Sequence, residues 1–219
     1  AGLLTFLLVR PDPLARAVDA PRRARVSPWP HLRGRALTAV VTIAASHAVM
    51  VSVMSLTPVH LEDHGADLEV IGLTISLHIA GMFALSPVFG WLSDRIGPAV
   101  VVLAGQAVLV LSTLVSGTAG HSEAQIMIGL VLLGLGWSMS VIAAAAMLTT
   151  AVSGEVRPAV QGIADLAMNV AGATGGLLAG LVMAWRDFGT LNAAAAVLTI
   201  PVIGLVVSGS RAAADVVRD

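Results

Sequence analysis

The chain alternates between long apolar segments and short polar connections. About 20 consecutive apolar residues are enough to cross the hydrocarbon core of a bilayer as an α-helix. Only helices and closed barrels satisfy their backbone in lipid, and these runs lack the alternating pattern of barrel strands. We therefore predict an all-α membrane protein with a six-helix bundle over 36–209. Its spans are 36–59, 69–92, 98–118, 124–150, 158–184 and 188–208.

Both ends of the chain depart from this pattern. Residues 1–9 are apolar but would form only about 14 Å of helix, too short to span. No basic region precedes them, so they are not typical of a secretory signal. We interpret them as the end of a truncated transmembrane helix, and the chain as a fragment. Residues 10–35 contain seven Arg and five Pro, which predicts a non-helical cytoplasmic linker, and 210–219 form a short cytoplasmic tail.

Composition supports a membrane location and excludes several activities. Hydrophobic residues make up 57% of the chain and charged residues 11%, too few to cover a soluble domain of this length. The net charge of −1 gives no argument for nucleic acid, and the absence of cysteine excludes disulfides and thiolate chemistry. No catalytic triad, zinc-helix signature or phosphate-binding loop occurs, so we expect neither an enzyme nor a bound cofactor.

The distribution of arginine predicts the orientation. All twelve basic residues are Arg, and with the linker in the cytoplasm eleven of them lie on that side. Seven are in the linker, and the others are Arg95, Arg157, Arg211 and Arg218. Only Arg186 falls on the outer side. This division follows the positive-inside rule and predicts a multi-pass protein of a bacterial cytoplasmic membrane, with the linker and the C-terminus inside.

One connection between spans carries a distinctive motif. Residues 90–97 read GWLSDRIG and hold the only charges between the second and third apolar segments. We read them as a loop with a tight turn. The motif resembles G-x-L-A/S-D-R-x-G, the loop signature of the major facilitator superfamily of secondary transporters. The family usually places two basic residues after the second glycine, where this chain has Pro98 and Ala99.

The resemblance implies where the chain belongs in a larger fold. The family has two six-helix bundles joined by a long cytoplasmic linker. The order found here matches the end of helix six, that linker and helices seven to twelve, with the N-terminal six-helix half missing. By resemblance, the conformational latch comprises Gly90, Asp94, Arg95 and Gly97, with Glu155 and Arg157 in the turn before helix eleven. The alternative is that Asp94 and Arg95 only solvate a turn and fix topology.

Polar residues inside the spans are the candidates for chemistry. Asp165 is the only acid away from the end of a span, and Asn169 shares its helical face. In the family, helices seven, eight, ten and eleven line the cavity, and His47, His78, Trp137 and Asn169 fall on these four. We therefore expect these five residues to form a substrate or proton pathway. In the alternative reading Asp165 satisfies local helix donors, and the other side chains only pack or hydrogen-bond between helices.

Glycine and proline positions predict local features of the spans. Gly172, Gly176 and Gly180 form a G-x-x-x-G-x-x-x-G ridge on which another helix can pack closely. Pro87 and Pro201 should kink their spans, while Pro58 lies near the outer end of its span and marks the end of that helix.

Together these features predict the C-terminal half of a secondary active transporter. It would move a small organic solute by alternating access, in proton-coupled efflux of the antiporter type, with lipid, the solute and the missing half as partners. A non-transporting scaffold or assembly subunit is the alternative. A third class is a membrane enzyme or haem protein that uses His47 and His78 as ligands.

Overall fold

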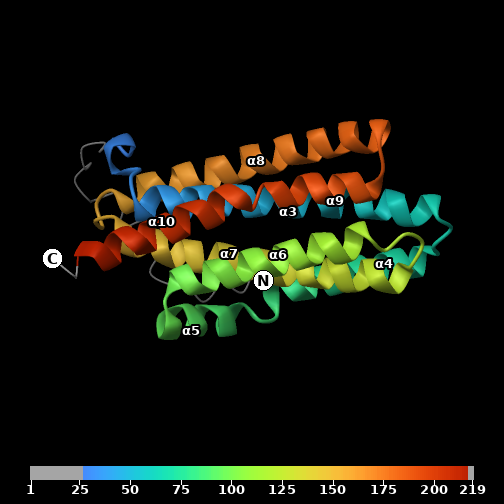
Figure 1. The fold of residues 1–219 in the computed structure, drawn as a ribbon, viewed down its shortest axis with the longest axis horizontal. Coiled ribbons are helices and arrows are strands. Elements are labelled where there is room, and N and C mark those ends of the chain that lie inside the picture. The colour runs from blue at the N-terminus through green and yellow to red at the C-terminus, as the bar shows by residue number, and fades with distance from the viewer. Residues whose placement is uncertain (1–26, 217–219) are drawn as a thin grey trace, which may run out of the picture.

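The computed structural model describes residues 27–216, with side chains as far as Gly209. Within this range the chain forms one 3-10 turn and eight α-helices, which build six candidate membrane spans (Figure 1). The all-α, six-span prediction is confirmed, while residues 1–9 and most of the linker lie outside the described part. The elements are η1 (Trp29–His31), α3 (Arg35–Asp63), α4 (Leu68–Phe83), α5 (Ser86–Ile96), α6 (Pro98–Gly117), α7 (Glu123–Ala151), α8 (Arg157–Trp185), α9 (Phe188–Val197) and α10 (Ile200–Val216).

Two of the spans are broken by proline, as the sequence predicts. The second span consists of α4 and α5, and the sixth consists of α9 and α10. Pro87 and Pro201 each stand at the second position of the later helix. Proline has no N–H to donate and clashes with the carbonyl four residues earlier, but it is tolerated in a first turn. The helix therefore stops a few residues before each proline, and a new helix begins with the proline in its first turn.

Two local predictions are wrong. Pro58 does not end its helix, because α3 continues through it to Asp63. Asp94 and Arg95 do not lie in a loop, because α5 extends to Ile96. The turn between the second and third spans is Gly97 alone, which adopts φ 90° and ψ 142° and caps both α5 and α6. A positive φ is readily adopted only by glycine, so this single residue is enough to reverse the chain.

Small residues bring the central helices close together. A Cβ atom added to Gly136 of α7 would lie 2.9 Å from the backbone nitrogen of Leu109 and 3.0 Å from the carbonyl oxygen of Gly105, both on α6. The Ser112 hydroxyl donates to the Gly129 carbonyl at 2.7 Å. Contacts of this kind let helices associate in lipid without a hydrophobic driving force. The two helices run antiparallel, so that Gly105 faces Ser140 and Gly136, while Ser112 and Ser116 face Gly129.

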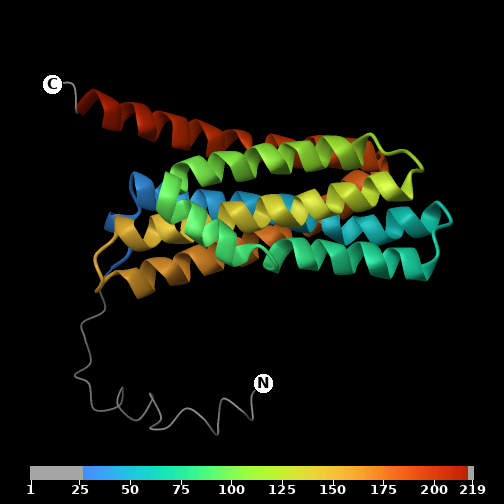
Figure 2. The ribbon, with the colours of Figure 1, turned by 90° about the horizontal axis from the view of Figure 1, so that it is seen from below.

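The spans differ in how much of their surface the rest of the bundle covers. The most apolar stretch of the α3 span is 56% buried inside the bundle. The corresponding stretches of the α4–α5 span and of α8 are each only 17% buried. In Figures 1 and 2, α8 and α5 lie at the periphery of the bundle. These two spans therefore offer the largest open faces.

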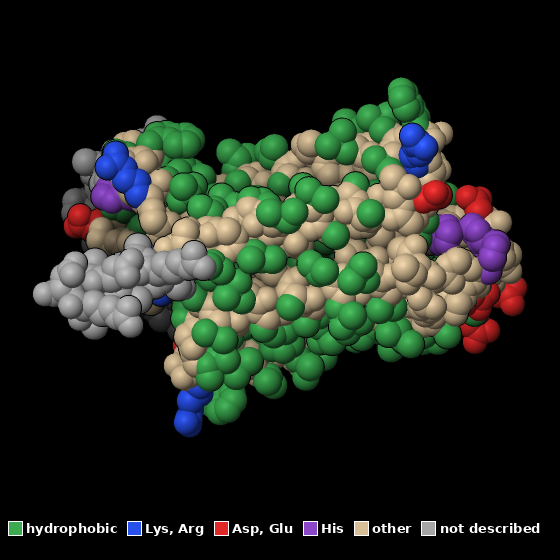
Figure 3. All heavy atoms as spheres, in the orientation of Figure 1, with side chains coloured by type: hydrophobic (Ala, Val, Ile, Leu, Met, Phe, Trp, Pro, Cys, Tyr) green, Lys and Arg blue, Asp and Glu red, His purple; other side chains and the backbone are tan. Residues whose placement is uncertain are grey.

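Charged side chains gather at the two ends of the bundle, with an apolar belt between them (Figure 3). We call one end the arginine-rich end (Arg33, Arg35, Arg95 and Arg157) and the other the acidic end (Glu62, Asp63, Asp67, Glu69, Glu123 and Asp187). Trp29 and Trp91 are exposed at the former and Trp185 at the latter. Tryptophan is enriched where membrane meets water, so these rings mark both boundaries.

A capping carboxylate starts the last span at the acidic end. Asp187 accepts a hydrogen bond from the backbone nitrogen of Thr190 at 2.7 Å, and it is the N-cap of α9. The backbone and side-chain hydrogen bonds from Thr190 hold the pKa of Asp187 below its usual value. The cap therefore remains ionised at neutral pH and satisfies a helix N–H that would otherwise be unpaired.

Candidate functional site

The central feature of the site is a pair of rings from two different spans. The indole nitrogen Nε1 of Trp137, on α7, donates to Nδ1 of His47, on α3, at 3.2 Å. An indole nitrogen can only donate, so Nδ1 of His47 must accept. The neutral imidazole therefore carries its proton on Nε2.

Two further helices complete the surroundings of this pair. A Cβ atom on Gly172 of α8 would lie 2.9 Å from Nε2 of His47 and 2.7 Å from its Cδ2. The Nε2 edge of the ring therefore faces α8, at a point where a larger side chain would displace it. On the other side, the Phe83 ring of α4 meets the Trp137 ring edge-on, with centroids 6.3 Å apart. Four spans thus converge on the His47–Trp137 pair.

This geometry links the charge of His47 to the position of Trp137. A second proton on the imidazole makes both ring nitrogens donors, and two donors cannot share a hydrogen bond. Protonation of His47 therefore requires the Trp137 hydrogen bond to break. The half-buried Nε2–H in turn remains a donor for another group.

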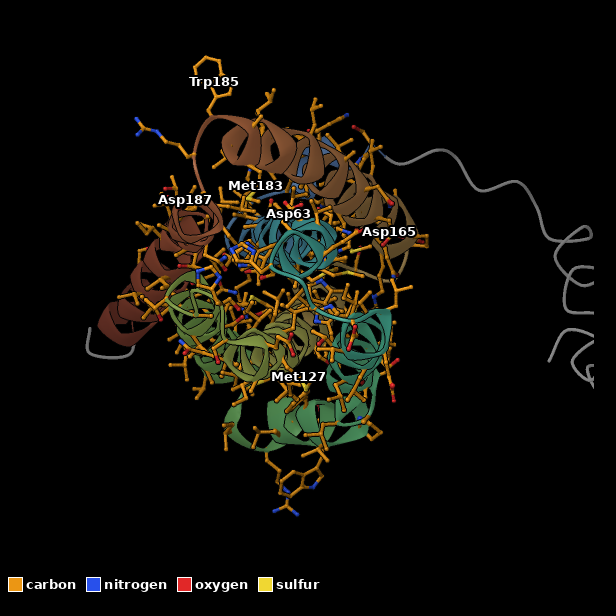
Figure 4. The ribbon with its side chains drawn as sticks, turned by 90° about the vertical axis from the view of Figure 1, so that its right-hand side faces the viewer. Asp63, Met127, Asp165, Met183, Trp185 and Asp187 are labelled. Carbon is orange, nitrogen blue, oxygen red and sulfur yellow. The ribbon has the colours of Figure 1, made fainter. Side chains whose placement is uncertain are left out.

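A strip of polar and small residues follows one side of α8. We call it the polar strip, and it comprises Gly162, Asp165, Asn169, Ala173, Gly176 and Gly180. Asp165 and Asn169 are exposed, and the Asn169 amide donates to the backbone carbonyl of Asp165 at 2.8 Å. Figure 4 shows Asp165 at the edge of the bundle. The strip borders the α3 contact at Gly172, so it lies next to the His47–Trp137 pair. Large apolar residues occupy the adjoining face, namely Leu166, Val170, Leu177 and Leu181.

His78 is held in a different place. Its ring is fully buried between α4 and α7, and Nδ1 donates to the Leu130 carbonyl at 2.8 Å. Nε2 is buried without a partner. Here Gly81 brings the helices together, because a Cβ on it would lie 2.9 Å from the Val131 carbonyl oxygen. The structure therefore places His78 in a helix contact, apart from the His47–Trp137 pair.

A fixed metal site does not form from these histidines or from those at the acidic end. The centre of the His64 ring lies 4.2 Å from that of His60 and 4.6 Å from that of His121, and the His60 ring stacks on Phe188. Among the described residues, however, no three His, Asp or Glu side chains are arranged to hold a metal ion.

The residues of the expected latch all lie at the arginine-rich end, on α5 and just before and at the start of α8. Asp94, Arg95, Glu155 and Arg157 are all exposed. The Arg95 guanidinium lies 5.3 Å from the centre of the Trp91 ring, one turn earlier on α5. Gly90 has open space beside it, and Gly97 forms the turn into α6. These side chains face outward, where a group outside this bundle can reach them.

The glycines of α8 divide into contact positions and open positions. Gly172 packs against His47, and a Cβ on Gly176 would make an ordinary 3.4 Å contact with Val51. Gly180 has nothing within 4 Å. The sequence prediction missed Gly175, where a Cβ would lie 3.0 Å from the Ala48 carbonyl oxygen. The closest approach of α3 and α8 therefore follows Gly172 and Gly175.

Sequence reasoning also missed a polar node inside the bundle. The Gln106 amide of α6 donates to the Ser46 hydroxyl of α3 and the Ser140 hydroxyl of α7, each at 2.9 Å. All three residues are fully buried. The available signal was that Gln106 is the one strongly polar side chain in an otherwise apolar span.

These features define a polytopic α-helical membrane protein with a strip of polar and small residues along one face of its bundle. Residues 38–215 match the family model of the Major Facilitator Superfamily. The chain belongs to that superfamily, as its loop motif predicted, and the match points to a transporter rather than an enzyme.

Bacterial relatives agree with this assignment. The chain is 31% identical to the uncharacterized MFS-type transporter YdeG of Bacillus subtilis and 32% identical to the uncharacterized MFS-type transporter YddS of the same organism. Each match covers 94% of this chain and 50% of the relative. The riboflavin transporter RfnT of Brucella anthropi is 28% identical, over 78% of this chain and 42% of its own length. The chain thus spans about half the length of the curated relatives it matches.

Proposed function

We propose that this chain forms one half of a secondary active transporter that moves a small organic solute by alternating access. Membership of the superfamily and the names of its relatives support this proposal. The arginine-rich end faces the bacterial cytoplasm in this scheme, in keeping with the positive-inside rule. Transport is proton-coupled and directed outward, so the protein acts as an antiporter.

The observation that carries the proposal is the polar strip beside the His47–Trp137 pair. An exposed carboxylate within a span is costly against lipid, so Asp165 must face protein or water. The two least buried spans, α4–α5 and α8, present faces on which a second six-helix bundle can pack. The pathway then runs between the two bundles, with the polar strip and His47 on its wall.

Each candidate residue has a role in this scheme. Asp165 binds the coupling proton, and Asn169 and the Nε2–H of His47 donate to the solute. When His47 takes up a proton the Trp137 hydrogen bond breaks, and the freed indole can move. The latch residues at the arginine-rich end make and break contacts with the second bundle as the pathway opens. His78 fixes the packing of α4 on α7.

Riboflavin is the first solute to test. One relative is named as a riboflavin transporter. The aromatic rings of Phe83 and Trp137 lie beside the pathway and suit a flat aromatic solute, because such rings stack favourably.

Cysteine accessibility tests the pathway without knowledge of the solute. The chain has no native cysteine, so single cysteines can be read without background from this half. We expect Asn169→Cys in the full-length protein to react with a water-soluble maleimide, and the rate to change when a proton gradient is imposed. The matched control is Leu178→Cys, which is exposed on the same helix outside the polar strip and should face lipid.

The outcome that contradicts the proposal is equally clear. If the cysteines at 169 and 178 are both unreactive with and without the gradient, the polar strip does not line an aqueous pathway. The scaffold function would then be favoured.

A further inference from the structure

A cavity lies away from the candidate solute pathway. At the arginine-rich end α10 diverges from the rest of the bundle (Figure 2), and a pocket of about 460 Å³ opens between α10 and helices α3, α6 and α7. The pocket shares no residue with the polar strip or with the His47–Trp137 pair. It therefore needs an explanation of its own.

The lining of this pocket is apolar inside and charged at its edge. Leu37, Ala99, Met147 and Leu205 supply the apolar walls. Arg35, at the first position of α3, supplies an exposed cation. Hydrocarbon suits such an interior better than a free ion does, and an anion suits the edge.

The start of α3 adds to the positive potential at this edge. No side chain caps the first turn of α3, which follows Gly34. The backbone N–H of Ala36 donates to the Arg33 carbonyl at 3.1 Å, whereas the N–H groups of Arg35 and Leu37 have no partner within the helix. The N-terminal end of a helix of this length also carries partial positive charge. Arg35 and the helix end therefore act on the same point.

The depth of the pocket in the membrane fits a lipid. Trp29 and Trp91 are exposed at the same end of the bundle and mark the boundary between headgroups and hydrocarbon. A ligand at this level can place an acyl chain in the apolar interior while its headgroup stays at the edge.

We infer that this pocket binds an anionic phospholipid, with an acyl chain between α10 and α3 and the phosphate at Arg35. Basic pockets between transmembrane helices on the cytoplasmic side are a recurring way of holding such headgroups. The inference concerns lipid bound as part of the structure, and it holds whichever solute the pathway carries.

Native mass spectrometry of the full-length protein in detergent tests this inference. Phosphatidylglycerol and phosphatidylcholine with identical acyl chains are added in parallel. We expect phosphatidylglycerol to be retained preferentially, and Arg35→Gln to weaken its binding about fivefold, as expected for loss of one headgroup contact. The control is Arg33→Gln, which removes the same charge at an exposed position that does not line the pocket and should have a much smaller effect.

A second variant tests the hydrocarbon part of the site. Ala99→Phe fills the interior and should reduce the retention of phosphatidylglycerol even with Arg35 present. Arg35 is exposed, so we expect Arg35→Gln to fold normally. This variant therefore tests the inference even if Ala99→Phe does not fold. The inference is overturned if Arg35→Gln binds phosphatidylglycerol as wild type does, if both lipids are retained equally, or if inorganic phosphate displaces the lipid.

Discussion

The polar side chains inside the spans are of two kinds. Gln106 and His78 are fully buried and hydrogen-bond to neighbouring helices. Asp165 and Asn169 are exposed on α8, with the Asn169 amide bonded only to its own helix. Polar groups in hydrocarbon need partners, so the first kind fixes the packing of this bundle, while the second needs water or another bundle.

Gln106 provides a prediction about stability. Gln106→Leu removes two interhelical hydrogen bonds but also removes Oε1, which is buried without a partner, so we expect a loss of only about 1 kcal/mol. Gln106→Glu can place a charge in the same dry site and should be far more damaging. Unfolding in mixed detergent and dodecyl sulfate micelles measures both. Equal losses for the two variants would show that the node does not act through hydrogen bonding.

Asp165 provides a prediction about coupling. Asp165→Asn keeps the shape of the side chain but cannot bind or release the proton, so we expect solute-driven proton flux to be abolished in proteoliposomes containing the full-length protein. The control is Asp187→Asn, which removes an acid outside the spans and retains a good N-cap. The assay uses a solute identified by screening, beginning with riboflavin. Normal pH-dependent flux in Asp165→Asn would exclude this carboxylate from coupling.

Among the helices, α8 shows most clearly how small residues serve two purposes. Its buried glycines at 172 and 175 allow close contact with α3, whereas Gly180 has open space beside it. The polar strip, which includes Gly180, is thus available to a helix from outside this bundle. Small residues at such positions permit close approach of backbones.

Two matched substitutions separate these purposes. Gly175→Val places side-chain atoms against the Ala48 backbone, where the clash cannot be relieved by a rotamer change, so we expect a large loss of thermal stability in detergent. Gly180→Val carries the same intrinsic cost of a β-branched residue in a helix but meets nothing within this bundle. It should leave folding intact and reduce transport activity. Equal stability of the two variants would contradict the packing of α8 on α3 described above.

The sequence predicted those features of the helices that depend on local chemistry. Span positions follow from continuous apolar runs, and the breaks before Pro87 and Pro201 follow from the missing proline N–H. Residues 94 and 95 were misassigned to a loop because charge at a membrane boundary does not stop a helix, whereas Gly97 does. The Gln106 node was missed because a helix that is apolar on almost every side does not reveal its rotation. Gly175 was missed because the sequence of α8 does not show which of its glycines face α3.

At the scale of the whole molecule, charge divides the bundle into two unlike ends. Among the described residues most arginines lie at one end and most carboxylates at the other (Figure 3). In a bacterial membrane this asymmetry selects one of the two orientations. The candidate latch and the proposed lipid pocket both lie at the arginine-rich end, so the orientation also decides the compartment in which they act.

Single cysteines at the two ends test the orientation. We expect Glu62→Cys, at the acidic end, to react with a membrane-impermeant maleimide in intact cells. Ser153→Cys, at the arginine-rich end, should react only after the cells are permeabilised. Both positions are exposed, so a difference in reactivity reports the side of the membrane. The reverse pattern would show that the positive-inside assignment is incorrect for this chain.

The close fit of α6 and α7 has a consequence for the order of folding. These helices are neighbours in the chain, joined by a short turn, and the close contacts of Gly105, Gly129 and Gly136 lie within the pair. The cost of closing a loop grows with its length, so this hairpin can assemble before α3 meets the distant α8. A nascent chain that has emerged as far as Ala151 already holds one complete interhelical interface, on which the later spans can assemble.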